Sequence, residues 1–410
     1  MQTDLAPWIR DTALGKEADD ILRRCVHCGF CQATCPTYQI KGDELDSPRG
    51  RIYLIKQVLE GETPTRTTQE HLDRCLTCRN CETTCPSGVQ YGALIDIGRQ
   101  VVNEKVERPL EQKVQRAVLR RVLTSQALGP ALKAGRMVKG VLPQSLQDKL
   151  PDPRPAGTVD THRTYSRHVI LPAGCVQPHM MPSIDAATQR VLQAVGIGTV
   201  PVVASGCCGA INFHLDAQEP ARHQMRANID AWLPVLESGA AEAVVMNASG
   251  CGGMIKEYAH HLRHDPAYRD KAQRLVSYVK DIAEVLAPLA DTLRDRIGAL
   301  PDHMAFHPPC TLQHWQGLRA VSEQLLTTLG FKLASFNESH LCCGSAGTYS
   351  ITQPELSHQL RDRKLDHMKQ AQVACVASSN IGCISHLQAG TTMPVRHWVE
   401  WVDQALLPQS

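Results

Sequence analysis

Cys25-Val-His-Cys28-Gly-Phe-Cys31-Gln-Ala-Thr-Cys35-Pro36 determines how the N-terminal part folds, and it recurs 50 residues later as Cys75-Leu-Thr-Cys78-Arg-Asn-Cys81-Glu-Thr-Thr-Cys85-Pro86. Both stretches follow C-x2-C-x2-C-x3-C-P. Three thiolates at this spacing surround one [4Fe–4S] cluster, and the fourth, turned away by the proline, reaches the other cluster. We therefore predict one cluster on Cys25, Cys28, Cys31 and Cys85, and a second on Cys35, Cys75, Cys78 and Cys81.

The alternatives for these cysteines are a zinc site and a set of disulfides. Zinc sites usually take two C-x-x-C pairs with a longer spacer and no third cysteine two residues on. An odd total of 17 cysteines, with no visible signal peptide, argues against a disulfide framework. His27 offers a further ligand, but four cysteines per cluster suffice. We expect it to tune the potential through a hydrogen bond or to be exposed.

The composition indicates a globular protein of two or three domains, with 410 residues, 43% hydrophobic and 20% charged. The net charge of +2 argues against nucleic acid as the main partner, and no apolar run approaches the roughly 20 residues that span a bilayer. Without a visible signal peptide, a cytoplasmic location is expected. The sequence has no G-x-G-x-x-G and no Walker A motif, so we expect no flavin or nucleotide on this chain.

Helical periodicity between and after the two cysteine stretches predicts a helical ferredoxin domain over residues 1–100. Residues 51–60 place Ile52, Ile55 and Val58 on one face, and Gly61 is expected to end that helix. A second helix is expected over residues 92–102. Gly29, beside Cys28, is expected to let the backbone approach inorganic sulfide closely.

Residues 101–160 are expected to form a basic helical connector without cysteine, ending in a linker over residues 150–157. Residues 99–154 hold 12 Lys or Arg against 5 Asp or Glu. An amphipathic helix is expected here, with Leu110, Val114, Ala117 and Val118 on its apolar face and Lys113, Arg116 and Arg120 on its basic face. Such a helix suits an anionic membrane surface or an acidic partner; the alternative is a solvated surface helix.

The later cysteines form two sets with matching spacing, which indicates an internal duplication. In each set a Cys-Cys-Gly pair follows the first cysteine by 32 residues, and Cys375 belongs to neither set. The first set is Cys175, Cys207, Cys208 and Cys251, and the second set is Cys310, Cys342, Cys343 and Cys383.

The cysteines of these sets follow short apolar runs that read as buried strands, with helices between them. A strand followed by a loop is expected in each of the runs 168–174, 200–206, 243–250, 304–309 and 373–382, and helices are expected over 186–195 and 218–237. Because loops at the carboxyl ends of strands converge in such sheets, each half is expected to gather its four thiols. These thiols suit a further cluster or a dithiol–disulfide cycle; the alternative is inert buried cysteine. The predicted fold class is α+β multidomain, with duplicated α/β cysteine-rich domains over 161–295 and 296–410.

These motifs together resemble a broad family of iron–sulfur subunits. The family includes those of glycolate oxidase, anaerobic glycerol-3-phosphate dehydrogenase, lactate-utilisation complexes and heterodisulfide reductase. The resemblance is closest to the glycolate oxidase iron–sulfur subunits and covers nearly the whole chain. The stretches that carry it, besides the two cysteine loops, are residues 46–61, 71–88, 248–251, 310–314 and 339–349.

The resemblance implies an assembly in which separate flavin-binding subunits oxidise glycolate to glyoxylate. This chain is then expected to pass the electrons to membrane quinone or its reductase, on the cytoplasmic face of the inner membrane. The fullest form of the cysteine-rich motif ends in C-x-x-C, whereas Ala248 and Asn380 occupy the first of those two positions here. The alternatives are the same role for a lactate or glycerol-3-phosphate dehydrogenase, or a thiol–disulfide enzyme.

Overall fold

The computed structural model describes residues 1–125, 127–141, 152 and 154–407, so the linker expected at 150–157 lies partly outside the described residues. The chain divides into two compact units. The first comprises Met1–Val118 and His340–Arg361, and the second comprises Leu119–Ser339 and Asp362–Ser410. The four-part division expected from the sequence stays a prediction, because compactness alone defines these units.

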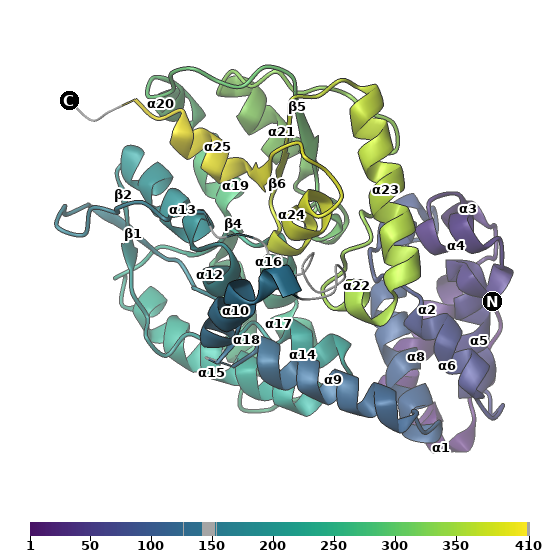
Figure 1. The fold of residues 1–410 in the computed structure, drawn as a ribbon. Coiled ribbons are helices and arrows are strands. Elements are labelled where there is room, and N and C mark those ends of the chain that lie inside the picture. The colour runs from purple at the N-terminus through teal and green to yellow at the C-terminus, as the bar shows by residue number, and fades with distance from the viewer. Residues whose placement is uncertain (126, 142–151, 153, 408–410) are drawn as a thin grey trace. The chain divides into compact units, whose positions relative to one another are not determined.

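The first unit is helical in its described residues, as the sequence predicts, and its N-terminal helices are the purple and blue ribbons in Figure 1. Its elements are α1 (Pro7–Arg10), α2 (Ala13–Arg24), α3 (Phe30–Ala33), α4 (Pro36–Lys41), η1 (Glu44–Asp46), α5 (Pro48–Leu59), α6 (Arg66–Asp73), α7 (Asn80–Thr84), α8 (Tyr91–Lys105) and α22 (Tyr349–Thr352). Two helices, α9 (Leu110–Leu123) and α23 (Pro354–Gln370), continue from one unit into the other.

Helix α5 shows how the sequence determines the elements of this unit. Ser47 caps its first turn by accepting a hydrogen bond from the Gly50 backbone N–H at 3.0 Å, and Pro48 occupies the first helical position. The predicted face is buried, with Ile55 1% exposed. The helix ends before Gly61, which has a φ of 116°, so the expected end is confirmed to within two residues.

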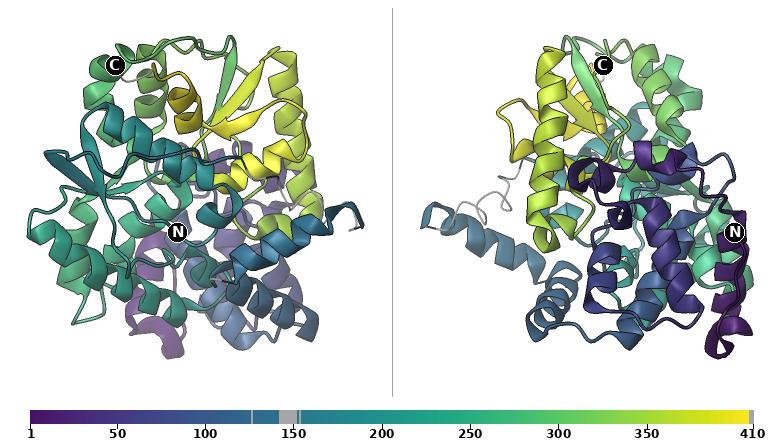
Figure 2. Two further views of the ribbon diagram at one scale, coloured as in Figure 1. Left: turned by 60° about the vertical axis from the view of Figure 1, so that its left-hand side comes forward. Right: turned by 90° about the vertical axis from the view of Figure 1, so that its right-hand side faces the viewer.

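The second unit contains two parallel sheets. The strands are β1 (Arg167–Ile170), β2 (Ile197–Val200), β3 (Val244–Met246), β4 (Val279–Asp281), β5 (Met304–His307), β6 (Cys375–Ser378) and β7 (Val395–His397). The first sheet has the order β2-β1-β3-β4 and the second the order β5-β6-β7. Figure 2 shows the second sheet in its left view, as green and yellow arrows.

The predicted duplication is visible in the order of these strands. In each sheet the strand before the first cysteine of a set, β1 or β5, pairs with the strand before the last cysteine, β3 or β6. A further parallel strand, β4 or β7, follows on the same side. In the second sheet, Leu333 occupies the place beside β5 that β2 has beside β1, and it forms an isolated parallel bridge with Met304.

Most helices of the second unit lie between these strands in the chain, whereas α10 (Leu128–Met137) and η2 (Lys139–Val141) precede β1 and α25 (Trp398–Gln404) follows β7; this mixture of helices and strands confirms the α+β fold class. The remaining helices are α12 (Gln177–Met180), α13 (Pro182–Ala194), α14 (Ala210–His214), α15 (Gln218–Glu237), α16 (Ser249–Lys256), α17 (Tyr258–His261), α18 (Arg269–Ser277), α19 (Ile282–Leu286), η3 (Ala287–Leu289), α20 (Ala290–Arg294), η4 (Thr311–Trp315), α21 (Arg319–Thr328) and α24 (Ile381–Gln388). The helices expected over 186–195 and 218–237 are present as α13 and α15.

One predicted strand is wrong in position. The run over 200–206 was expected to be the strand before Cys207, whereas β2 covers Ile197–Val200 and the chain from 201 to 206 forms a loop. Pro201 explains the difference, because proline has no N–H to donate to a neighbouring strand. The remaining four expected strands are present in the earlier part of their runs, and a loop follows each of them or a helix begins there.

The two sheets share one hydrophobic core. Val169 and Val245 from the first sheet belong to the same buried cluster as Met304 and Phe306 from the second. Trp398, at the start of α25, is 1% exposed within this cluster. The duplicated halves therefore stabilise each other by burying a common apolar surface.

Helix α9 confirms the expected amphipathic helix but not a free basic face. Its apolar residues are exposed, with Leu110 75%, Val114 53% and Val118 52% exposed. Arg116 forms an ion pair with the buried Asp73 at 3.3 Å. Among the described residues, no helix is long and apolar enough to cross a bilayer.

Asp281 makes the stability of the second unit depend on pH. Burial raises the pKa of its carboxyl to about 7, although Oδ1 accepts a hydrogen bond from the Ala283 N–H at 2.9 Å. The folded chain therefore binds a proton that the unfolded chain releases between about pH 4 and pH 7, so stability falls as the pH rises through this window.

Asp281→Asn keeps the helix cap and removes the titration. We expect it to raise the free energy of unfolding at pH 8 by up to about 4 kcal/mol, with a much smaller effect at pH 4. Thermal unfolding of both proteins across this range measures the effect, with the exposed Asp270→Asn as control. Equal pH profiles for Asp281→Asn and the parent chain would contradict this prediction.

Candidate iron–sulfur centres

The two cysteine loops share an unusual backbone conformation at equivalent positions. His27 and Thr77 have φ of 53° and 51°, and Gly29 and Arg79 have φ of 85° and 59°. Left-handed backbone costs roughly 1–2 kcal/mol for a residue with a side chain, so three such residues indicate loops shaped for a ligand. The loops turn backbone donors inward: the Thr77 N–H donates to Cys75 Sγ at 3.4 Å.

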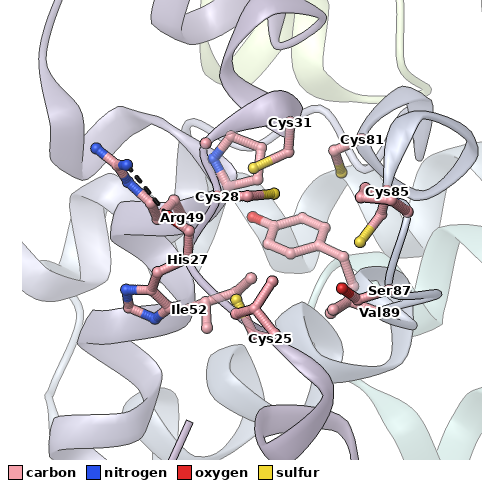
Figure 3. A pocket seen from close by; sticks show the side chains of 15 residues that line it. Cys25, His27, Cys28, Cys31, Arg49, Ile52, Cys81, Cys85, Ser87 and Val89 are labelled. Atoms are coloured by element: carbon pink, nitrogen blue, oxygen red, sulfur yellow. Dashed lines mark hydrogen bonds between the residues drawn. The ribbon is translucent and has the colours of Figure 1, made fainter.

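The thiols predicted for the first cluster border one pocket. Cys25, Cys28 and Cys31 line it together with Cys85 from the other repeat, and Figure 3 shows their sulfur atoms directed toward a common space. Burial raises the pKa of the Cys25 thiol, and the neighbouring Cys85 and Cys28 add to the increase. The fourth thiol of the crossed set therefore lies where that prediction requires it.

The thiols predicted for the second cluster border a second pocket, which Cys35, Cys75, Cys78 and Cys81 line. Cys81 also borders the first pocket. Burial raises the pKa of the Cys81 thiol far above its usual value, and the thiols that add to this increase are Cys78, Cys75 and Cys35. All three other members of its predicted set are therefore close enough to Cys81 to affect its thiol, as is Glu82.

The donor chemistry of both pockets fits [4Fe–4S] clusters. Burial raises the pKa of the Cys31 thiol to about 11, and it also raises the pKa of the Cys35 thiol. Thiols in this state are protonated at neutral pH, and bound iron supplies the positive charge that holds them as thiolates. Two groups of four thiols are the ligands that two such clusters need.

A buried guanidinium group lies beside the second group of thiols. Arg51 is 1% exposed and donates to the His71 carbonyl at 2.7 Å, to Thr37 Oγ1 at 3.1 Å and to Asp46 Oδ1 at 3.2 Å. Thr37 Oγ1 lies 3.3 Å from Cys35 Sγ. Burial raises the pKa of the Cys35 thiol, and the charge of Arg51 opposes that increase. The same charge stabilises the extra electron of a reduced cluster.

The carboxylate of Asp46 connects this guanidinium to two further basic side chains. Asp46 is fully buried, and its oxygens lie 3.1 Å from Arg74 Nη1 and 3.1 Å from His71 Nδ1. In the sequence, Asp46, Arg51 and His71 had no expected role beyond the resemblance carried by residues 46–61 and 71–88. The structure shows why these stretches belong together, because they meet in one buried network beside Cys35 and Cys75.

Tyr91 borders both pockets, and its hydroxyl donates to Cys75 Sγ at 3.5 Å. Hydrogen bonds to cluster sulfur raise the reduction potential.

We expect Tyr91→Phe to keep both clusters and to lower the reduction potential of the second cluster by less than about 59 mV, which corresponds to a tenfold change in a one-electron equilibrium. A potentiometric titration followed by EPR measures the shift, with the exposed Tyr53→Phe as control. An unchanged potential in Tyr91→Phe would count against this role.

The segment His340–Arg361 belongs to the same unit as the cysteine loops and holds the second Cys-Cys-Gly motif. Asn80 Nδ2 donates to the His340 carbonyl at 3.4 Å, and the Tyr349 hydroxyl donates to the Arg74 carbonyl at 3.0 Å. Both bonds join this segment to residues beside the second group of thiols, the first through the Asn80 side chain and the second through the Arg74 backbone. The spacing of the cysteines gives no indication that the segment His340–Arg361 packs with the N-terminal cysteine loops.

The structure brings together the first cysteine-rich set in the second unit. Hydrogen bonds from Cys175 and Cys208 hold the pKa of the Cys207 thiol below its usual value. Cys251 is a hydrogen-bonding neighbour of Cys208. These thiols follow β1, β2 and β3, so the expected convergence at the carboxyl ends of the strands is present in this half.

The second cysteine-rich set is divided between the two compact units. Cys342 and Cys343 belong to the first unit, and Cys310 and Cys383 belong to the second. That these four thiols share a site therefore stays a prediction. Cys375, which the spacing left outside both sets, is buried in β6, and burial raises the pKa of its thiol to about 11.

Comparison with known proteins agrees with this architecture. Residues 21–89 match the family model of a 4Fe-4S dicluster domain, and residues 169–256 and 304–388 match that of a cysteine-rich domain. The chain carries iron–sulfur clusters, in keeping with these domains.

Curated relatives extend the similarity over the whole chain. The chain is 49% identical over 410 residues to the glycolate oxidase iron-sulfur subunit of Escherichia coli, covering 99% of each chain. It is 30% identical over 400 residues to the probable glycolate oxidase iron-sulfur subunit of Bacillus subtilis, covering 90% of this chain and 89% of the relative. Lactate utilization protein A of Geobacillus thermodenitrificans is 26% identical over 236 residues, 55% of this chain and 94% of the relative.

Proposed function

Because the chain belongs to the family of glycolate oxidase iron–sulfur subunits, we propose that it transfers the electrons released when glycolate is oxidised to glyoxylate. Flavin-binding subunits of the same complex carry out that oxidation, and a membrane acceptor such as quinone receives the electrons. The single observation that supports this role best is the pair of adjoining pockets, each bordered by four thiols drawn from both cysteine loops.

The residues around the two groups of thiols differ in a way that suits directed transfer. Arg51, Thr37 and Tyr91 supply a positive charge and hydroxyl groups to the second group. The first group lies closer to the surface, with Cys28 exposed. A cluster at the second group is therefore the one expected to hold the electron more tightly, because positive charge and hydrogen bonds to sulfur raise its potential.

Attachment to the cytoplasmic face of the inner membrane is part of this proposal. The exposed apolar face of α9, formed by Leu110, Val114 and Val118, is the feature that supports it. Flotation of the complex with vesicles tests the attachment. A complex that stays wholly in the soluble fraction at low salt would count against it.

The experiment that tests the proposed function is substrate-driven bleaching of the clusters. The native complex, purified without oxygen, receives glycolate, D-lactate or glycerol-3-phosphate in separate samples while the visible cluster absorbance is recorded. Bleaching by glycolate with a flavoprotein present is the expected result. Bleaching by another substrate alone would keep the electron-transfer role and replace the donor.

A second candidate function is thiol–disulfide chemistry at Cys207 and Cys208, which the lowered pKa of the Cys207 thiol favours. Alkylation of the folded, cluster-loaded protein separates the two functions. Modification of Cys207, with no substrate bleaching and no flavoprotein bound, would favour the thiol enzyme. Cysteines beyond residue 174 that resist alkylation, together with more than about eight irons per chain, would exclude it.

A further inference from the structure

His307 occupies a position where a buried histidine needs a partner that the described polypeptide does not provide. It is the last residue of β5, its side chain is 0% exposed, and neither Nδ1 nor Nε2 has a hydrogen-bond partner among the described residues. Native proteins rarely leave both nitrogens of a buried imidazole unpaired. The ring therefore points to a ligand that is not part of the polypeptide.

Further polar groups at the same sheet edge lack partners as well. His307 pairs in register with Ser378, the last residue of β6, and the Ser378 and Ser379 hydroxyls are buried without partners among the described residues. The carboxyl ends of two adjacent parallel strands thus present three unpaired polar side chains. Such strand ends are where α/β sheets bind ligands.

A thiol lies beside this imidazole. A ring nitrogen of His307 and Cys383 Sγ are within 4.8 Å of each other, and Cys383 is 9% exposed in the first turn of α24. The preceding Asn380 is already engaged, because its Oδ1 accepts a hydrogen bond from the Gly382 N–H at 2.9 Å and its Nδ2 donates to Ser249 Oγ at 3.4 Å. The imidazole of His307 and the thiol of Cys383 are therefore two metal-ligating groups within reach of one ion.

We propose that His307 and Cys383 are ligands of a metal centre at the carboxyl edge of the second sheet. Imidazole nitrogen and thiolate sulfur together suit iron in an iron–sulfur cluster or zinc. Cys310, three residues after His307 in the loop that follows β5, is the third candidate ligand within this unit. Cys310 and Cys383 are candidate ligands from the sequence, whereas the H-x-x-C spacing of His307 and Cys310 gains significance only from the burial of the imidazole.

The test measures metal content and nitrogen ligation, and it needs no activity assay. Iron and zinc are counted in the full-length protein, purified without oxygen, for the parent chain and for His307→Ala. The parent chain is expected to hold more than about eight irons, the content of two [4Fe–4S] clusters, or about one zinc in addition to them. His307→Ala is expected to lose that excess while keeping the eight irons.

Two controls make this result specific. His303→Ala removes an exposed histidine just before the same strand and is expected to leave all metal in place. His307→Cys restores a ligand atom and is expected to regain the excess metal, which also covers the case in which His307→Ala does not fold. If the excess is iron, pulsed EPR of reduced protein labelled with [15N]histidine is expected to show 15N coupling that His307→Cys lacks.

The proposal is overturned if the parent chain holds only eight irons and no zinc, because a buried water would then satisfy these side chains. It is also overturned if His307→Ala keeps the full metal content of the parent chain. Neither result bears on the proposed function, because the two clusters of the cysteine loops are counted separately.

Discussion

The double variant Cys25→Ser/Cys85→Ser is expected to lose about four irons per chain, no more than Cys25→Ser or Cys85→Ser alone. Cys25 and Cys85 come from different repeats but border the same pocket, so removing both destroys one cluster. Cys25→Ser/Cys35→Ser is expected to lose about eight irons, because Cys35 borders the other pocket. Each of these variants is expected to lose nearly all electron transfer from substrate to acceptor.

This comparison of double variants tests the crossed ligand sets directly. If each repeat instead bound its own cluster, Cys25→Ser/Cys35→Ser would lose four irons and Cys25→Ser/Cys85→Ser would lose eight. Cys375→Ser is a matched control, because Cys375 is buried in β6 and belongs to neither set. It is expected to keep all iron. Iron analysis with cluster absorbance gives the count, and circular dichroism reports whether each variant is folded.

Arg51→Met is expected to lower the free energy of unfolding of the first unit by about 3–5 kcal/mol. Removing this guanidinium leaves the fully buried Asp46 with one cationic partner fewer, and it takes hydrogen bonds from Thr37 and the His71 carbonyl. An uncompensated buried charge is costly because the interior solvates it poorly. Chemical denaturation without oxygen, followed by circular dichroism and cluster absorbance, measures the loss.

A second readout distinguishes electrostatic tuning from structural support. Arg51→Met is expected to shift the second cluster to a lower reduction potential, because a positive charge near Cys35 and Cys75 is lost. Adding Asp46→Asn to Arg51→Met is expected to recover part of the stability but not the potential.

Arg49→Met is the matched control for both measurements. Arg49 is 34% exposed and pairs with the half-exposed Glu44 at 2.8 Å, so a loss of less than about 1 kcal/mol is expected. Equal effects of Arg49→Met and Arg51→Met on the free energy of unfolding would show that the buried network around Asp46 contributes no more than an exposed ion pair.

The sequence alone was sufficient to predict the grouping of the eight N-terminal thiols at two pockets, the duplication and most of the elements. The C-x2-C-x2-C-x3-C-P motif is local: spacing and a proline determine which thiols face one space, whatever the rest of the chain does. The 32-residue interval repeats because each half is built from the same strands, β1 and β3 or β5 and β6. The strand β2 was predicted too late in the chain. A pattern of apolar residues does not reveal that Pro201 lacks the backbone N–H that a strand needs for pairing.

Tertiary structure alone revealed the groups that surround these thiols. Arg51 and Tyr91 approach Cys75, and His307 approaches Cys383, only in the folded chain, and in the sequence each is one polar residue among many. Their roles follow from burial, because a charge, a hydroxyl or an imidazole removed from water must find a partner in space. Local spacing by itself predicts which atoms bind iron in this protein, whereas non-local packing decides the electrostatic environment around those atoms.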